Sequence, residues 1–251
     1  MVLEIIGLLG ISSPRTQAYL DAMVRGDLRP AFVILLHDER AGRLPGQRQG
    51  DAPLAGTLDQ AGIPYEVIPT TDVNDPRVRE AVAARPEEVF IYSGAGGAIL
   101  RKEILSLGKR FLHVHPGLVP AYRGSTPLYY SILSEGACGA SAIFLTERID
   151  GGPVIRTKRY PPPADGTTID YVYDPQIRAD LLLEVLEAYR RDGTFRATDQ
   201  VVEPGETYYI IHPVLKHLAI LACGQGAARS AACGTSSPPR LVAGPPARSA
   251  A

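Results

Sequence analysis

Short apolar runs rich in β-branched residues alternate with segments of helical period along the first half of the chain. Such runs have the length and continuity of strands buried on both faces of a sheet. They are Val2–Leu9, Ala31–Leu36, Tyr65–Ile68, Val89–Tyr92 and Phe111–Val114. The alternation predicts an α/β fold, a Rossmann-like open and mostly parallel sheet with flanking helices. Open sheets of this kind bind ligands beyond the carboxyl ends of their strands, so we expect functional residues there.

Two proline-containing pairs mark where helices begin. Ser13-Pro14 and Asp75-Pro76 each place a capping side chain before a proline suited to the first helical position. The pair Ser12-Ser13 could instead present backbone N–H groups to a phosphate. We favour the cap, because capping already explains both serines.

The pattern changes after residue 138. Ser141–Leu145 and Val154–Lys158 flank Asp150-Gly151-Gly152, which predicts a β-hairpin-like element added to the sheet. Asp174-Pro175 then opens a long helix that ends near Gly193, and its apolar stripe should cover the sheet. The run Thr207–Pro213 is either an extra strand leading to a short helix or part of a dimer contact.

Composition excludes several classes of protein. Lys and Arg (26) nearly balance Asp and Glu (27), so no basic field favours capture of a nucleic acid. The three cysteines show no C-x-x-C spacing, which fits a reducing compartment and predicts a cytoplasmic protein. Apolar runs fall short of the roughly 18 residues that a membrane span needs, so we expect no membrane partner.

The segment with the most chemical information is Phe111-Leu112-His113-Val114-His115-Pro116. Residues two apart in a strand share one face, so His113 and His115 should point together while Leu112 and Val114 enter the core. Pro116 ends the strand, which places both imidazoles at the ligand-binding edge. A pair of hydrogen-bonded structural histidines is the alternative, and two on one face favour function.

Asp150 is the candidate carboxylate partner. It lies in Ile149-Asp150-Gly151-Gly152-Pro153, where glycines allow the backbone to approach a ligand closely. By itself Asp-Gly-Gly is usually only a turn.

Two other segments also allow two interpretations. Ser93–Gly97 is a cofactor-approach loop or a plain strand-to-helix turn, and Arg123 holds an anionic substrate or is a solvated loop arginine.

These residues belong to a series of linked motifs that resembles the formyltransferase family, which includes glycinamide ribonucleotide, methionyl-tRNA and sugar-amine formyltransferases. Both the order of the motifs and the interval from histidine to aspartate fit, and a run of linked motifs is far more specific than one alone. The motifs are His115-Pro116-Gly117-Leu118-Val119-Pro120, Tyr122-Arg123-Gly124, Pro127, Gly139-Ala140-Ser141 and Asp150-Gly151-Gly152-Pro153-Val154-Ile155.

The resemblance implies an N-formyltransferase with 10-formyltetrahydrofolate as formyl donor and a small-molecule amine, an aminosugar or biosynthetic intermediate, as acceptor. The folate pterin would lie against Gly97, Ala98, Ile99 and Leu100 and the loop through Ile149. His115 and Asp150 match the family's catalytic His and Asp. His113 stands where the family has Asn, and could donate one N–H to an oxyanion. Gly117 replaces the family's Ser, which predicts a roomier loop.

Three alternative functions remain open. His113, His115 and Asp150 could hold a metal in a hydrolase, but we expect no metal because the family's motifs are explained without one. Loss of the Asn could leave a folate-binding protein without catalysis. Water could also replace the amine, which would give a hydrolase of formyl-folate.

The resemblance and the composition together divide the chain into three parts. We expect a formyltransferase-type catalytic domain over 1–195, a small C-terminal extension over 196–223 and a disordered tail over 224–251, where large apolar residues are scarce. Methionyl-tRNA is disfavoured as acceptor because no dense basic patch follows residue 200. A homodimer is left open.

Overall fold

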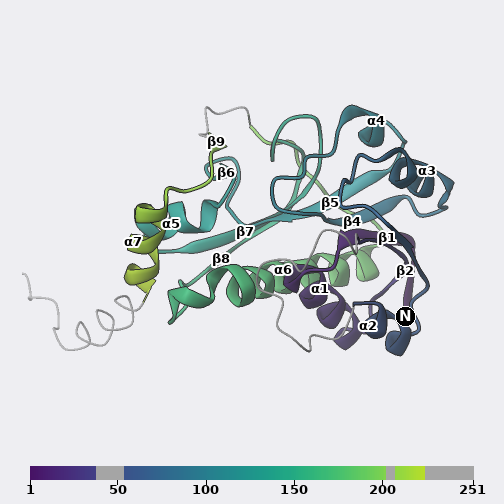
Figure 1. Ribbon diagram of the computed structural model, residues 1–251, viewed down its shortest axis with the longest axis horizontal. Helices are drawn as coiled ribbons and strands as arrows, with labels where there is room; N and C mark the ends of the chain where they lie inside the picture. Colours follow the sequence, from purple (N-terminus) through teal and green to yellow (C-terminus); the bar gives the residue numbers. More distant parts are fainter. Residues whose placement is uncertain (38–53, 202–206, 224–251) are drawn as a thin grey trace, which may run out of the picture.

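The computed structural model describes residues 1–37, 54–201 and 207–223 (Figure 1). The predicted disordered tail, 224–251, lies outside the described residues. Within the described part, a seven-stranded sheet is flanked by helices on both faces. The predicted Rossmann-like α/β fold is therefore confirmed.

The central sheet has the strand order β3-β2-β1-β4-β5-β7-β8. The first five strands in this order are parallel, and β7 and β8 are antiparallel to their neighbours. The strands are β1 (Val2–Ile11), β2 (Arg29–Leu36), β3 (Tyr65–Ile68), β4 (Val89–Ser93), β5 (Arg110–His115), β7 (Cys138–Phe144) and β8 (Val154–Tyr160). All five parallel strands and the β7–β8 hairpin were predicted from the pattern of apolar residues.

Helices α1, α2 and α6 lie on one face of the sheet, and α3 and α4 on the other (Figure 1). A 3₁₀ turn, Gly166–Thr168, and a π-helical turn, Ile169–Tyr173, lead directly into α6. The helices are α1 (Pro14–Arg25), α2 (Leu54–Ala61), α3 (Pro76–Ala84), α4 (Lys102–Leu105), α5 (Pro127–Glu135), α6 (Asp174–Asp192) and α7 (Pro213–Cys223). None of the described helices is both long and apolar enough to cross a membrane.

The local sequence explains where the helices begin and end. The Ser13 hydroxyl accepts a hydrogen bond from the Thr16 backbone N–H at 3.2 Å, which confirms the capping interpretation of this serine. Asp75 caps α3 in the same way through the N–H of Arg77. Helix α6 ends at Gly193, whose φ of 69° is the left-handed conformation that glycine adopts without strain.

A small second layer covers the end of the sheet near α5. Strand β6 (Arg123–Gly124) pairs in parallel with β9 (Thr207–Tyr208). Helix α7 follows β9 and packs against α5 around Leu128, Ile132 and Ala219 (Figure 1). The run after residue 207 is thus a short strand leading to a helix, the first of its two interpretations.

The register of β5 and β7 fixes the course of the Asp150 loop. Leu112 pairs with Phe144, and His115 pairs with Ser141, so β7 ends beside the start of β5. The loop that follows β7 must therefore fold back along β5 to bring Asp150 to the end of that strand. Gly152 permits this turn, because a Cβ there would lie 1.9 Å from the Phe144 carbonyl oxygen.

Candidate active site

A cavity of about 530 Å³ opens beyond the carboxyl ends of β4 and β5. This is the edge at which open α/β sheets bind ligands. All of the residues predicted for the site line it: His113, His115, Asp150, Gly97, Ala98, Ile99, Leu100 and Ile149. The structure therefore brings the predicted catalytic and folate-binding groups together, although their roles stay predictions.

The two histidines share one face of β5, as their spacing predicted. Leu112 and Val114 are fully buried in the core on the other face. His113 is partly buried and His115 is 2% exposed, and their ring centroids lie 6.4 Å apart. The imidazoles therefore reach the cavity from a rigid strand.

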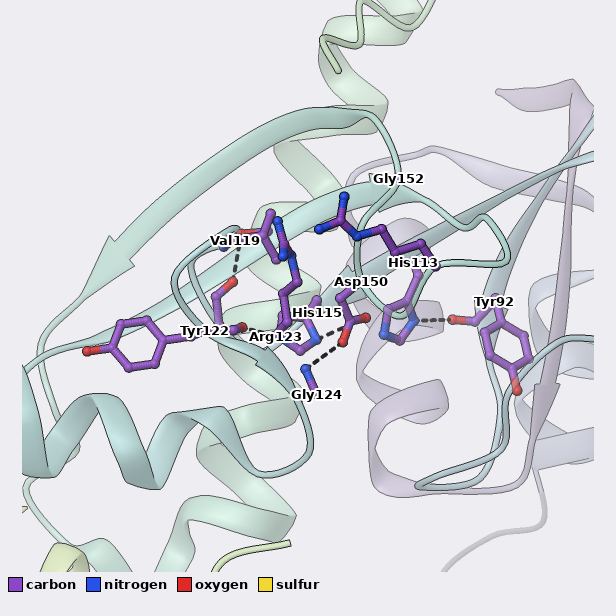
Figure 2. A network of polar contacts seen from close by, with 12 residues as sticks. Tyr92, His113, His115, Val119, Tyr122, Arg123, Gly124, Asp150 and Gly152 are labelled. Atoms are coloured by element: carbon purple, nitrogen blue, oxygen red, sulfur yellow. Dashed lines mark hydrogen bonds and ion pairs between the residues drawn. The ribbon is translucent and has the colours of Figure 1, made fainter. Parts of the chain in front are cut away.

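His115 has both ring nitrogens engaged (Figure 2). Its Nε2 lies 2.7 Å from the Tyr122 carbonyl oxygen, and its Nδ1 lies 3.4 Å from Asp150 Oδ1. A carbonyl oxygen only accepts hydrogen bonds, so Nε2 carries a proton. In the neutral ring, Nδ1 then directs a lone pair at the Asp150 carboxylate. This arrangement is favourable only when a proton or another cation lies between the two atoms.

The surroundings of His115 act on its pKa in opposite directions. Burial is the larger influence and lowers the pKa, whereas the negative charge of Asp150 and the hydrogen bond to Tyr122 raise it. The net shift is downward. Burial therefore outweighs the attraction of Asp150 and favours the neutral imidazole of His115.

Gly117 closes the loop beside this pair. A Cβ at this position would lie 2.6 Å from the Tyr122 carbonyl oxygen and 2.9 Å from His115 Nε2. The expectation of a roomier loop is therefore wrong, because the absent side chain is what allows the His115–Tyr122 hydrogen bond.

Asp150 is held from three directions. Its Oδ2 accepts a hydrogen bond from the Gly124 N–H at 2.8 Å (Figure 2), and its backbone has the uncommon φ of 48°. The Gln200 amide donates to the carbonyl oxygens of Asp150 and Gly152 at 2.7 and 2.8 Å. The first bond fixes the carboxylate, and the two from Gln200 fix the backbone of its loop.

Arg123 holds Gln200, the residue that binds the backbone of the Asp150 loop. It is 2% exposed, and its guanidinium donates to Gln200 Oε1 at 3.1 and 3.3 Å. The solvated-arginine interpretation is therefore wrong, and the guanidinium binds a protein amide. Sequence reasoning missed Gln200, because a single glutamine fifty residues after Asp150 has no pattern that marks it.

His113 faces the cavity with a different ring atom. Its Nδ1 lies 3.4 Å from the Tyr92 carbonyl oxygen, so Nδ1 is the protonated nitrogen and Nε2 carries a lone pair in the neutral ring (Figure 2). Burial lowers the pKa of His113 well below 6.5, and the charges of Arg178 and Arg15 add to this. The oxyanion-donor role considered for His113 would require the charged ring, which burial opposes.

Two arginines that the sequence did not single out line the same cavity. Arg15 donates to Ser93 Oγ at 3.0 Å and to the Gly94 carbonyl oxygen, and burial lowers its pKa to about 10, so it stays charged at neutral pH. Arg178 is 3% exposed and lies 3.3 Å from Asp174, but its Nε and Nη2 have no hydrogen-bond partner. A charged residue inside the apolar stripe of α6 was the signal that could have identified Arg178.

Comparisons with known proteins identify the family. Residues 13–174 match the formyl transferase family model, so the chain belongs to that family. A methionyl-tRNA formyltransferase of Roseiflexus sp. (strain RS-1) is 31% identical over 163 residues, which cover 63% of this chain and 48% of that protein. The chain thus spans about half the length of the curated relatives it matches.

Solved structures share the fold. A sugar N-formyltransferase from Shewanella sp. FDAARGOS_354 superposes with a TM-score of 0.58 at 18% identity over 87% of each chain. HypX from Aquifex aeolicus in complex with tetrahydrofolic acid gives a TM-score of 0.55 at 17% identity, over 83% of this chain and 30% of HypX.

Proposed function

We propose that this chain is an N-formyltransferase that moves the formyl group of 10-formyltetrahydrofolate to the amine of a small molecule. The observation that carries the proposal is the meeting of His115 and Asp150, 3.4 Å apart, beside a cavity at the strand ends. Membership of the formyl transferase family supports it, because the matched region, 13–174, contains both residues.

The cavity fits a folate donor in size and lining. Its volume of about 530 Å³ lies in the range of small-molecule sites. Ile99 and Ile149 are 55% and 45% exposed at the cavity, so a flat heteroaromatic ring would remove apolar surface from water there. Gly97, with a φ of 79°, has no side chain to block the approach. The folate, when bound, would supply the formyl group.

Asp150 and His115 would handle the proton of the attacking amine. An amine that attacks a formyl carbon must lose a proton, and the Asp150 carboxylate is placed to accept it, because Gly124 holds its Oδ2 and Gln200 holds the backbone of its loop. His115 would orient the Asp150 carboxylate, because its Nε2–H is fixed by the Tyr122 carbonyl oxygen and its Nδ1 faces Asp150. Such positioned acid–base groups contribute about 10²–10⁴ in rate.

Positive charge near His113 would stabilise the negative charge that develops on the formyl oxygen. Arg15 and Arg178 both lower the pKa of His113, so their fields reach this part of the cavity. In the family a carboxamide supplies a hydrogen bond at this place, and here fixed cationic groups would provide the electrostatic stabilisation.

We further propose an aminosugar or a related small amine as acceptor. The near balance of charges, 26 basic against 27 acidic side chains, gives no field for a polyanion, so we do not expect methionyl-tRNA or another nucleic acid. The fold neighbour from Shewanella is a sugar N-formyltransferase, and its likeness extends over 87% of each chain. The buried free thiols of Cys138 and Cys223 fit a reducing, cytoplasmic setting.

The test is a mass-spectrometric assay of the purified chain with 10-formyltetrahydrofolate and a panel of amines. The panel contains nucleotide-linked aminosugars, glycinamide ribonucleotide and methionyl-tRNA. The proposal predicts the mass gain of one formyl group on a small amine. Formylation of methionyl-tRNA alone would overturn the acceptor class, and no formylated product with any amine would overturn the proposed activity.

A further inference from the structure

Three side chains around the cavity direct lone pairs at one point. One ligand atom each from His113, His115 and Asp150 lies within 4.8 Å of the other two. For His115 this atom is Nδ1, because Nε2 donates to the Tyr122 carbonyl oxygen. For His113 it is Nε2, because Nδ1 donates to the Tyr92 carbonyl oxygen. Neutral imidazoles in these tautomers cannot donate to one another or to Asp150.

The same contacts are those that orient histidines in metal sites. A metal-bound histidine nearly always donates its other ring N–H to a carboxylate, a backbone carbonyl or water. Here both histidines donate to backbone carbonyls, those of Tyr92 and Tyr122. Asp150 keeps Oδ1 toward the histidines while Oδ2 accepts from the Gly124 N–H. Each prospective ligand is therefore already held by the surrounding protein.

The distances agree with a tetrahedral ion. Ligands at about 2.0–2.1 Å from zinc lie about 3.4 Å from one another at tetrahedral angles. His115 Nδ1 and Asp150 Oδ1 are 3.4 Å apart. His113 completes the set from the same strand face and would need only a small movement of its ring toward the other two.

We propose that His113 Nε2, His115 Nδ1 and Asp150 Oδ1 form a binding site for a divalent transition-metal ion of the zinc class. Two imidazoles and one carboxylate are a ligand set that such ions accept, with the fourth position left open. That position faces the cavity and would take an oxygen ligand, either water or a substrate carbonyl. The proposal replaces the expectation of a metal-free site, which rested on family motifs that contain Asn where this chain has His113.

The charges around the site allow a cation. Arg15 and Arg178 oppose it, but Arg178 is paired with Asp174 at 3.3 Å, and Asp150 is itself a ligand. The two carboxylates balance the two guanidinium groups before an ion binds. The arginines would then favour an anionic or strongly polar oxygen in the fourth position.

The test measures metal and requires neither folate nor acceptor, so it can fail or succeed separately from the proposed formyl transfer. The full chain is purified without a histidine tag, equilibrated with Zn²⁺, dialysed and analysed by mass spectrometry for metal content. About one bound Zn²⁺ per chain is expected, as for a single three-ligand site. His113→Asn, which introduces the residue usual in the family, should weaken zinc binding by more than about 100-fold.

His217→Asn is the matched control, because His217 is exposed on α7 and should leave zinc binding unchanged. Equal zinc content in wild type and His113→Asn, or no zinc in the wild type, would overturn the proposal. Should His113→Asn fail to fold, an anomalous difference map of wild-type crystals grown with Zn²⁺ decides. A peak among the three ligand atoms supports the site, and no peak there overturns it.

Discussion

The two sides of the cavity differ in how completely the protein satisfies its own polar groups. On the Asp150 side, Gly124, Gln200 and Arg123 form a connected set of hydrogen bonds around Asp150, and His115 donates to the Tyr122 carbonyl oxygen. On the Arg178 side, Arg178 Nε and Nη2 and one oxygen of Asp174 are buried without a hydrogen-bond partner. Buried polar groups are normally satisfied, so unpaired ones need an explanation. The Asp150 side is the rigid side, because these hydrogen bonds hold it in place, whereas the Arg178 side keeps unpaired polar atoms.

The substitution with the largest expected effect on the Asp150 side is Asp150→Asn. The amide keeps the shape and can still accept from the Gly124 N–H, so the fold should persist. The proton acceptor is lost, and we expect turnover to fall by about 10²–10⁴ while folate affinity changes little. Steady-state kinetics and folate titration measure the two effects. Asp59→Asn, at an exposed position of α2, is the control. Near-normal turnover in Asp150→Asn would show that Asp150 takes no part in the mechanism.

Gly124→Ala tests whether the Asp150 side depends on the close packing of the Gly124 backbone against β9. A Cβ at Gly124, with a φ of 91°, would lie 2.2 Å from the Tyr208 carbonyl oxygen. Gly136→Ala has a similarly positive φ of 60° but open space around it, so it isolates the strain of the conformation. We expect Gly124→Ala to lower the free energy of unfolding by about 1–3 kcal/mol more than Gly136→Ala. Equal losses in urea titrations would show that β9 does not pack closely there.

Gln200→Ala should have a smaller effect, on both stability and turnover. It leaves the Arg123 guanidinium and the Asp150 carbonyl oxygen without their partner, which costs about 1–3 kcal/mol. Turnover should fall as well, because the Asp150 loop loses two hydrogen bonds. Gln176→Ala, at an exposed position of α6, is the control. A stability loss without any change in turnover would separate Gln200 from the site.

The last expected effect, the dependence of stability on pH, is absent at neutral pH and develops only in acid. The pKa values of His113 and His115 are lowered in the folded protein, so below pH 6.5 the unfolded chain takes up protons that the folded chain does not. Stability should therefore fall as pH decreases, by up to about 1.4 kcal/mol per pH unit for each histidine. Urea titrations at pH 7.5, 6 and 5 measure it. His113→Asn should show a shallower loss, and an identical slope would contradict a neutral His113.

The strands and the two histidines could be predicted because their positions repeat locally. A continuous apolar run defines each parallel strand, and a spacing of two places His113 and His115 on one face whatever the rest of the fold. Asp150 could be assigned only through the resemblance of the linked motifs. Its loop reaches His115 by folding back along β5, which depends on the register with β7.

The remaining site residues could not be predicted because tertiary structure alone brings them together. Arg15 comes from α1, Arg178 from α6 and Gln200 from the segment after α6. Arg15 and Gln200 have no distinguishing sequence context, and the position of Arg178 in the apolar stripe of α6 does not show that it reaches the cavity. The backbone carbonyls of Tyr92 and Tyr122 that set the histidine tautomers carry no sequence signal, since every residue has a carbonyl. Gly117 was misjudged for the same reason, because only the folded loop brings the atoms of His115, Tyr122 and Pro127 close to it.

The most direct test of formyl transfer is the stoichiometry of one reaction mixture. Wild-type protein is incubated with 10-formyltetrahydrofolate and a responsive aminosugar, and released tetrahydrofolate and formylated acceptor are quantified together. The proposed transfer predicts equal amounts of both products and no tetrahydrofolate release when the acceptor is omitted. Release that does not depend on acceptor would show hydrolysis, and would contradict the assignment of this cavity to N-formyl transfer.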